Sequence, residues 1–346
     1  MRLTIESIRA RLGRAWVTGH GSVTDRELLL VKLHAEDGQV GYGEAAPLAS
    51  YDGVSVAEVR ASLESCRPAL GQADRTPRAD LRARLEEAVV LPQALAALDL
   101  ALWDLEGRRA GEPVWRRLGA EAAEPVAVNW TMAAEDRAGA AREAALARTQ
   151  GYKTLKCKVA IGDDAGRLAA VRAVAGPELK IRIDANGAWS AEEAQANLRV
   201  LAPVGIELCE EPVTGAAAIA ALDKATEVPL ALDESTIEPG VLDSRVCDLV
   251  CLKIGGCGGL TGLLAAAHRA RAAGYEVYLA STLDGPLGIA AALHAAAALA
   301  PLRACGLNTL ALFAGRPNPL PASEGAIAPP VTPGLGEGLL DWYERR

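Results

Sequence analysis

Short apolar runs alternate with segments rich in Ala, Arg and Glu between about residue 123 and residue 314. The runs, such as KTLKCKVA, LKIRIDA and VCDLVCLKIG, have the length and composition of buried strands, and the segments between them have helical spacing. Eight strand runs, mostly 20–26 residues apart, predict a β/α barrel of the TIM type. The alternative is an open doubly wound sheet, which usually carries a phosphate-binding loop after its first strand. The segment AVNWTMAAED contains no such loop.

The first third of the chain has a different pattern, without a repeat. Two β-rich runs, RLTIESIRARL and ELLLVKLHAEDGQVGYGEAAP, carry a hairpin signal at EDG. Three helical patterns follow, and the longest, LPQALAALDLALWDLEGRRAG, is apolar along one face and ends at Gly111. We therefore predict an α+β unit over residues 1–122, a barrel over 123–314, and a Pro- and Gly-rich tail, 315–346, that folds back on the α+β unit.

A charged residue stands at the end of five consecutive apolar runs. Because active sites in β/α barrels form where the strands end at the carboxyl face, we expect these five side chains to surround one point. One strand-end charge is usually a helix cap or a surface residue, but five of complementary type in succession favour a site. The five residues are Lys158, Asp184, Glu210, Asp233 and Lys253.

The three acidic residues, Asp184, Glu210 and Asp233, predict a metal site. Converging carboxylates repel one another unless a cation neutralises them. Hard oxygen ligands, with no His or Cys at the matching positions, favour Mg²⁺ over zinc, with Mn²⁺ as a substitute.

The two lysines, Lys158 and Lys253, predict acid–base chemistry across that metal. A lysine acts as a base when its pKa is lowered from about 10.4 towards 7–8. A nearby divalent cation and a second ammonium lower this pKa because they disfavour the charged form. Removal of a proton α to a carboxylate uses all five groups, since its enediolate product is stabilised by Mg²⁺ and a lysine.

Further residues are candidates for substrate contacts or for supporting the ligands. Lys156 shares a strand face with Lys158 and is expected to assist the base. Arg182 is expected to point into the barrel, towards the substrate or a ligand carboxylate. Glu211 and Glu234 are expected on the other side of their strand ends, in supporting or structural roles. The other candidates are Tyr51 in the loop 45–55, Asn186 beside a ligand candidate, Asp284, read equally as a helix N-cap or a site-lining residue, and Gly306 in the last strand.

Composition and charge exclude several classes of partner. The chain of 346 residues has a net charge of −8 and no basic run, so we expect no nucleic acid partner. We find no signal peptide, and apolar stretches such as 289–300 are shorter than a membrane span. We therefore expect a cytoplasmic enzyme with a small carboxylate substrate and leave homo-oligomerisation open.

The cysteines and histidines do not form a recognisable metal motif. Seven cysteines without framework spacing are expected to be reduced, and those around Cys251 lack the CxxC spacing of a zinc site. The four histidines show no ligand spacing. His268 and His294 lie in helical patterns and are expected to be structural.

The order KCK, DAN, EEP, DES and LK followed by a Gly-rich turn resembles the enolase superfamily, muconate-lactonizing subgroup. The segments GYGEAAPLASYDG and ALDLALWDLEGRRAGEPVWRRLG resemble its specificity loop and its linking helix. Sites of this superfamily place a lysine or histidine base beside Mg²⁺. The resemblance implies an α+β cap over a (β/α)₇β barrel, with Mg²⁺ on Asp184, Glu210 and Asp233 and with Lys158 and Lys253 as the acid–base pair.

Three activities of that subgroup compete. The segments VNWTM, RIDANGAW, ELCEEP and CGLNTLALF resemble VNATV, RLDANRAW, FLEEP and GLDTLDL of o-succinylbenzoate synthases, which eliminate water in menaquinone synthesis. Epimerisation of a dipeptide or an N-acylamino acid ranks second. Dipeptide epimerases carry an Asp-x-Asp on the last strand, and this chain has GLNT there, without an acidic residue. The segments GGCGGLTG and STLDGPLG are shared with epimerases and cycloisomerases, and muconate cycloisomerase is third. We expect an activity like that of o-succinylbenzoate synthase.

Overall fold

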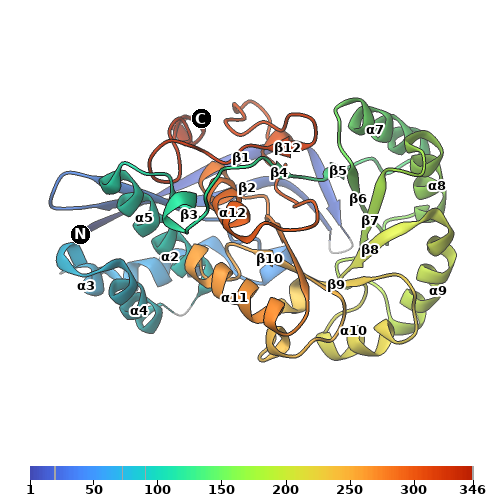
Figure 1. Cartoon of the computed structure of the whole chain (residues 1–346), viewed down its shortest axis with the longest axis horizontal. Coiled ribbons are helices and arrows are strands. Elements are labelled where there is room, and N and C mark those ends of the chain that lie inside the picture. The colour runs from blue at the N-terminus through green and yellow to red at the C-terminus, as the bar shows by residue number, and fades with distance from the viewer. Residues whose placement is uncertain (19–20, 72, 90, 345–346) are drawn as a thin grey trace.

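The computed structural model describes residues 1–18, 21–71, 73–89 and 91–344. A three-stranded antiparallel sheet with its helices lies at one end of the molecule, and a curled parallel sheet ringed by helices lies at the other (Figure 1). The predicted architecture, an α+β cap beside a β/α barrel, is therefore confirmed. The bounds 1–122, 123–314 and 315–346 stay a prediction.

Seven parallel strands form the barrel wall in sequential order. A further segment closes it, because parallel bridges join Cys305 to Val128 on one side and Gly306 to Ala280 on the other. The strands are β5 (Trp130–Met132), β6 (Thr154–Lys158), β7 (Lys180–Asp184), β8 (Ile206–Glu210), β9 (Leu230–Leu232), β10 (Leu249–Lys253) and β11 (Glu276–Ala280).

Strand register explains how the strand-end charges reach one level. Lys158 lies opposite Asp184, and Asp184 lies opposite Glu210 in the next strand. Side chains alternate between the two faces of a strand, so Ile181 and Ile183 pack outward in the hydrophobic core while Asp184 faces the barrel interior.

The outer ring consists of helices whose apolar faces pack on the strands (Figure 1). Helix α9 begins with a capping box in which Ser190 accepts a hydrogen bond from the Glu193 amide and the Glu193 side chain accepts one from the Ser190 amide. The helices are α7 (Arg137–Thr149), α8 (Asp164–Ala175), α9 (Ala191–Leu201), α10 (Ala216–Asp223), α11 (Leu260–Ala272) and α12 (Pro286–Leu299).

The cap sheet lies between its own helices and the barrel. Strand β2 is buried on both faces: Leu29 and Val31 pack in the cap core, and Leu28 and Leu30 pack in the core shared with the barrel. A continuous apolar run is the pattern of a strand covered on two sides. The elements are β1 (Arg2–Thr18), β2 (Gly21–His34), β3 (Val40–Ala45), α1 (Ala49–Asp52), α2 (Val56–Ser65), α3 (Arg67–Leu70), α4 (Arg78–Ala88), α5 (Pro92–Ala110) and α6 (Val114–Arg117).

Strand β3 and helix α5 pack backbone against backbone. A Cβ atom at Gly43 would lie 1.9 Å from the carbonyl oxygen of Ala97, so this position requires glycine. The hairpin predicted at EDG joins β2 to β3. The sequence pattern missed the second antiparallel pair, in which β1 runs on to Thr18 and Thr18 lies opposite Gly21 of β2.

The tail crosses both units. Strand β12 (Ala326–Ile327) pairs antiparallel with β4 (Val126–Ala127) beside the barrel. Arg316 donates a hydrogen bond of 2.6 Å to the Arg9 carbonyl of the cap. Helix α13 (Asp341–Glu344) follows, and Tyr343 contacts the Glu44 carboxylate of β3.

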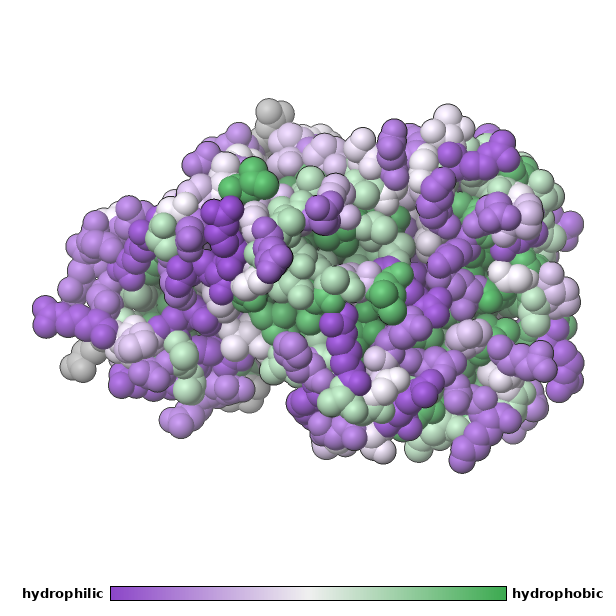
Figure 2. Space-filling view, viewed as in Figure 1, coloured by the Kyte–Doolittle hydropathy of each residue, from purple (hydrophilic) through white to green (hydrophobic). Residues whose placement is uncertain are grey.

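On the face shown in Figure 2, apolar residues gather over α12 and the loops beside it, and polar residues cover the outer helices. In the described part of the chain, every helix falls short of the length and apolar character that crossing a membrane requires.

His294 in α12 should make stability pH-dependent. Its Nδ1 accepts a hydrogen bond from the Trp115 amide at 3.2 Å, and its Nε2 lies 3.1 Å from the Leu335 carbonyl, so the ring is neutral. Burial lowers the pKa of His294 to about 4. The unfolded chain, with a pKa of about 6.5, then binds the proton first, so this contribution is complete above pH 6.5 and decreases by about 3 kcal/mol as the pH falls to 4.

Urea unfolding at several pH values tests this prediction. Between pH 7 and pH 4.5, the free energy of unfolding of His294→Gln should decrease less than that of the unaltered chain. His268→Gln, at an exposed position of α11, is the matched control and should keep the full slope. Equal slopes for all three chains would contradict the prediction.

Candidate active site

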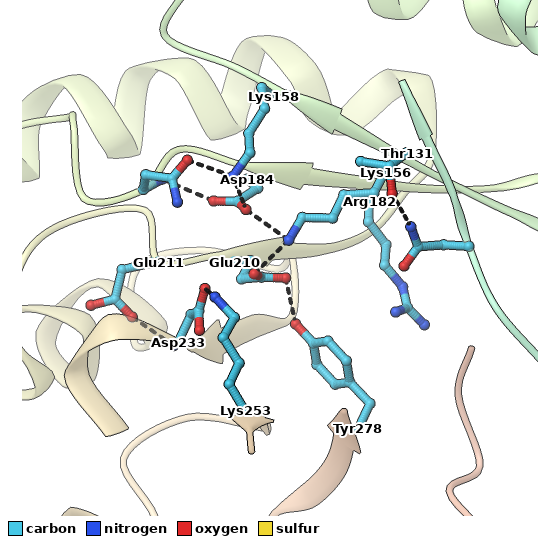
Figure 3. A network of polar contacts seen from close by, with 12 residues as sticks. Thr131, Lys156, Lys158, Arg182, Asp184, Glu210, Glu211, Asp233, Lys253 and Tyr278 are labelled. Atoms are coloured by element: carbon cyan, nitrogen blue, oxygen red, sulfur yellow. Dashed lines mark hydrogen bonds and ion pairs between the residues drawn. The ribbon is translucent and has the colours of Figure 1, made fainter. Parts of the chain in front are cut away.

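The five strand-end charges meet at the carboxyl ends of the barrel strands (Figure 3). Lys158 Nζ lies 2.6 Å from Asp184 Oδ2, and Lys253 Nζ lies 2.6 Å from Asp233 Oδ2. The two lysines approach the carboxylates from opposite sides in Figure 3, with Glu210 between them. The structure thus brings together all five residues that the sequence singled out.

Lys156 connects two of the carboxylates. Its Nζ lies 2.7 Å from Asp184 Oδ2 and 2.6 Å from Glu210 Oε1. Both carboxylates are fully buried, so the ammonium replaces the water that would otherwise solvate them. Lys156 therefore binds the acidic residues directly. Its assistance to the base stays a prediction.

Burial and ion pairing act in opposite directions on these groups. Burial alone would lower the pKa of Lys156 and Lys253, but the neighbouring carboxylates outweigh it and raise both values. Burial raises the pKa of Glu210 to about 7. Lys156 lowers this pKa, and Asp184 raises it further. For Asp184, burial is outweighed by Lys156 and Lys158, and the pKa is lowered. The lowering of a lysine pKa by a bound divalent cation stays a prediction.

The donor set fits a hard divalent cation. Glu210 and Asp233 each place a carboxylate oxygen, and Cys251 its sulfur, so that the three atoms lie within 4.8 Å of one another. Asp184 adjoins this group through the Lys156 bridge. Burial raises the pKa of Cys251 well above its ordinary range, which keeps the sulfur protonated, so the carboxylate oxygens are the donors for a cation. Such oxygen donors suit Mg²⁺ or Mn²⁺.

Tyr51 brings the cap into the site. It lies in α1, and its hydroxyl donates a hydrogen bond of 2.7 Å to Asp233 Oδ1. The ammonium of Lys253 lies 3.8 Å from the centre of the Tyr51 ring, a cation–π distance. One cap residue therefore contacts both a ligand candidate and a lysine of the acid–base pair.

Asn186 and Glu234 form the wall beside Lys158. The Oδ1 of Asn186 accepts a hydrogen bond of 2.6 Å from Lys158, and its Nδ2 donates one of 2.9 Å to Glu234 Oε1. A cavity at the strand ends, called the chamber below, is lined by residues that include Tyr51, Lys158, Lys253 and Glu234. The expectation that Glu234 points to the other side of its strand end is therefore wrong. Glu211 does point away, and its carboxylate accepts the amides of Asp233 and Ser235 at 2.7 and 3.1 Å.

Arg182 lies in the barrel interior but does not line the chamber. Its Nε donates to Glu207 Oε2 and its Nη1 to the Ala304 carbonyl, both at 2.6 Å. These partners hold the guanidinium away from the strand ends. Arg182 therefore makes no direct contact with Asp184, Glu210 or Asp233. Its contact with a substrate stays a prediction.

Asp284 and Gly306 have different outcomes. The N-cap residue of α12 is Gly285, and Asp284 is buried without lining the chamber, so neither expectation for Asp284 holds. Gly306 does line the chamber, in the segment that closes the barrel. A Cβ atom at Gly306 would lie 3.0 Å from the Cβ of Ala280, which leaves little room for a larger residue.

Several chamber residues were missed in the sequence. They come from β1 and β2 near their shared end, from the segment after β3, from β5, from β11 and the residues after it, and from the segment that closes the barrel. These segments are far apart in the sequence, and local pattern does not bring them together. They are Trp16, Val23, Leu48, Ser50, Thr131, Ala280, Ser281, Thr282, Leu283 and Thr309.

Tyr278 is a further buried residue that the sequence analysis missed (Figure 3). Its hydroxyl donates a hydrogen bond of 2.7 Å to Glu210 Oε2, and its ring lies 4.9 Å from the guanidinium carbon of Arg182. Its position two residues before Ala280, at the end of β11, was the available signal, since alternate residues share a strand face.

Tyr278→Phe should weaken Mg²⁺ binding about 10–100-fold, because Glu210 loses the donor that orients its carboxylate. Isothermal titration with Mg²⁺ measures the effect. Tyr275→Phe is the matched control: its hydroxyl bonds to the backbone of Val241, Ser244 and Val246, away from the site, so its loss should lower stability alone. Equal Mg²⁺ affinity in both variants would contradict the role of Tyr278.

Comparisons with known proteins agree with this geometry. Residues 4–119 match the model "Mandelate racemase / muconate lactonizing enzyme, N-terminal domain", and residues 139–341 match "Enolase C-terminal domain-like". The chain is 32% identical to muconate cycloisomerase 1-1 of Acinetobacter lwoffii, over 92% of this chain and 88% of that protein. It is 38% identical to o-succinylbenzoate synthase of Mycobacterium leprae, over 54% of this chain and 58% of that protein.

A solved structure extends the comparison to a relative with bound metal. It is the dipeptide epimerase from Cytophaga hutchinsonii complexed with Mg and the dipeptide D-Ala-L-Val. The TM-score is 0.87 at 25% identity, over 98% of each chain.

Proposed function

The chain belongs to the mandelate racemase and muconate lactonizing enzyme family of the enolase superfamily, and from that premise we propose that it is a dehydratase of the o-succinylbenzoate synthase type. It would remove the proton α to a carboxylate of a cyclohexadiene substrate and expel the β-hydroxyl as water. The product would be the aromatic o-succinylbenzoate used in menaquinone synthesis.

Asp184, Glu210 and Asp233 would hold a divalent cation, Mg²⁺ in the first instance. Bound there, it supplies positive charge that stabilises the charge developing on the substrate carboxylate. The chain's own contribution is to bury the three acidic residues beside the amino groups of Lys156, Lys158 and Lys253.

Lys158 is the proposed base. Its Nζ takes the α-proton, and the electron pair of the broken C–H bond moves towards the carboxylate to give the enediolate. The electrons then return, the bond to the β-oxygen breaks, and protonated Lys158 gives its proton to the leaving hydroxyl, which departs as water. Lys158 is thereby restored. Lys253, on the opposite side, remains an ammonium that stabilises the enediolate electrostatically.

One observation favours dehydration over epimerisation of a dipeptide. The chamber wall from the segment after β11 and from the segment that closes the barrel has no charged side chain: its residues are Ala280, Ser281, Thr282, Leu283, Gly306 and Thr309. Asn308 turns away from this wall and donates to the Tyr152 hydroxyl at 2.7 Å. A substrate ammonium would find no carboxylate on this wall, and the resemblance to o-succinylbenzoate synthases supports the same activity.

The second candidate function is epimerisation of an N-acylamino acid or a dipeptide. The two lysines on opposite sides of the carboxylates favour it, because one could remove the α-proton and the other return a proton to the opposite face. The similarity to the epimerase of Cytophaga hutchinsonii also supports it. A cycloisomerase like the Acinetobacter relative ranks third.

The test is a pair of assays on the same preparation with Mg²⁺. The proposal expects loss of the absorbance of the cyclohexadiene precursor, dependent on both enzyme and Mg²⁺. Dipeptides and N-acylamino acids incubated in D₂O, followed by mass spectrometry, should acquire no α-deuterium at a comparable rate. Deuterium uptake without loss of the precursor would replace the dehydratase proposal by the epimerase one.

A further inference from the structure

Arg26 on β2 connects two distant loops through main-chain carbonyls. Its Nη1 donates to the Pro47 carbonyl at 2.7 Å, and its Nη2 donates to the Ala46 carbonyl at 2.9 Å. Nη2 also donates to the Thr282 carbonyl at 3.1 Å, and Nε makes a longer contact of 3.5 Å with the Leu283 carbonyl. All three nitrogens of one guanidinium are therefore used, shared between the cap and the barrel.

Both connected loops form walls of the chamber. Ala46 and Pro47 lead directly into α1, and Leu48, Ser50 and Tyr51 from that stretch line the chamber. Thr282 and Leu283 line it from the barrel side. Arg26 itself does not line the chamber, so it acts on the site only through these two loops.

Arg26 is buried beside two acidic residues. It is only 3% exposed, and Asp284 and Glu44 act electrostatically on its guanidinium. Glu44 on β3 holds the barrel loop from its other end, because its Oε1 accepts the Gly285 amide at 2.8 Å. Two cap residues thus hold the loop after β11: Arg26 binds two of its carbonyl groups, and Glu44 binds one of its amides.

The barrel loop has a backbone conformation that needs such support. Leu283 has a φ of 59°, in the left-handed region that is unfavourable for a residue other than glycine. Such a conformation persists only when surrounding contacts determine it. The contact of Arg26 with the Leu283 carbonyl is one of these contacts.

We propose that Arg26 is a positioning residue that sets the separation of the two chamber walls and thereby the fit of the substrate. The proposal rests on the proposed function only in taking the chamber as the place of turnover. Loss of the planar guanidinium of Arg26 would let the two walls separate, and the substrate would then bind with its reacting atoms displaced. Displacements of about 1 Å at reacting atoms can lower rates about 100-fold.

Two measurements on the full chain test the proposal. Arg26→Lys keeps the buried charge but not the fork geometry, and Lys32→Met removes a cation of the same strand that pairs with Glu6, as the control. We expect Arg26→Lys to raise KM and lower kcat/KM about 10–100-fold. Amide hydrogen exchange in segments 46–53 and 281–287 should accelerate in this variant, and the Mg²⁺ affinity should stay unchanged. Lys32→Met should match the unaltered chain throughout.

Hydrogen exchange keeps the proposal separate from the choice of reaction. If neither candidate substrate is turned over, the proposed function fails, but the exchange measurement still tests Arg26. Unchanged exchange in both segments would overturn the positioning role, and so would acceleration spread evenly over the whole chain. Should Arg26→Lys not fold, the unaltered chain remains decisive: the two segments should open with the same exchange free energy, and independent opening would overturn the proposal.

Discussion

Lys158→Ala is expected to lower kcat by about 10²–10⁴-fold, the usual contribution of a general acid or base. The ammonium of Lys158 lies 2.6 Å from both Asp184 Oδ2 and Asn186 Oδ1, at the chamber wall. Alanine removes the proposed base from that side, where the remaining amine, Lys156, is held by Asp184 and Glu210. Lys253 approaches from the opposite side (Figure 3). Steady-state turnover of whichever substrate the unaltered chain converts measures the loss.

Comparison with Lys253→Ala assigns the roles of the two lysines. If Lys158 is the base, Lys253→Ala should also lower turnover but should retain exchange of the substrate α-proton with D₂O. Lys158→Ala should lose that exchange. Lys153→Ala, at an exposed position just before β6, is the matched control and should turn over normally. Full turnover by Lys158→Ala would remove Lys158 from the mechanism.

The sequence predicted the centre of the site because that part depends on local features. A residue at the end of a parallel barrel strand faces the same rim as its neighbours in the adjacent strands. Lys158, Asp184 and Glu210 are in register across β6, β7 and β8, so strand position alone placed them together. The metal and acid–base roles assigned to them stay predictions.

Lys156 and Arg182 show where local reasoning ends. They lie opposite each other on β6 and β7, and each is two residues before a strand-end charge. Lys156 extends to Asp184 and Glu210, whereas Arg182 turns to Glu207 and Ala304. Alternation along a strand predicts on which face of the sheet a side chain lies. The direction in which that side chain then extends is determined by its partners on other strands.

The chamber walls also depend on contacts far apart in the sequence. Tyr51 reaches Asp233 from 182 residues away, and Arg26 reaches Thr282 from 256 residues away. Trp16 and Val23 meet the site because β1 and β2 extend further than the apolar pattern indicated. No periodicity of 2 or 3.6 residues carries this information, since it arises only when the cap packs on the barrel.

Asp233→Asn is expected to weaken Mg²⁺ binding at least about 100-fold, more than the loss of a supporting hydrogen bond causes. An amide retains an oxygen but loses the charge that attracts a cation. The buried ammonium of Lys253 would also lose its carboxylate partner at 2.6 Å, which costs about 3–5 kcal/mol of folding stability for a buried pair. The variant should therefore unfold at lower urea without metal, and Mg²⁺ should stabilise it less than it stabilises the unaltered chain.

Asp243→Asn separates these effects from the general loss of an acidic residue. Asp243 forms an exposed ion pair with Arg269. Its replacement should change stability by less than about 1 kcal/mol and leave Mg²⁺ affinity intact. Titration calorimetry and urea unfolding with and without Mg²⁺ give both quantities for each chain. If Asp233→Asn kept full affinity, Asp233 would not be a ligand, and Glu210 with Asp184 would have to hold the cation. Lys253 and Tyr51 would then be the reason that Asp233 is buried, because both bond to its carboxylate from opposite units of the fold.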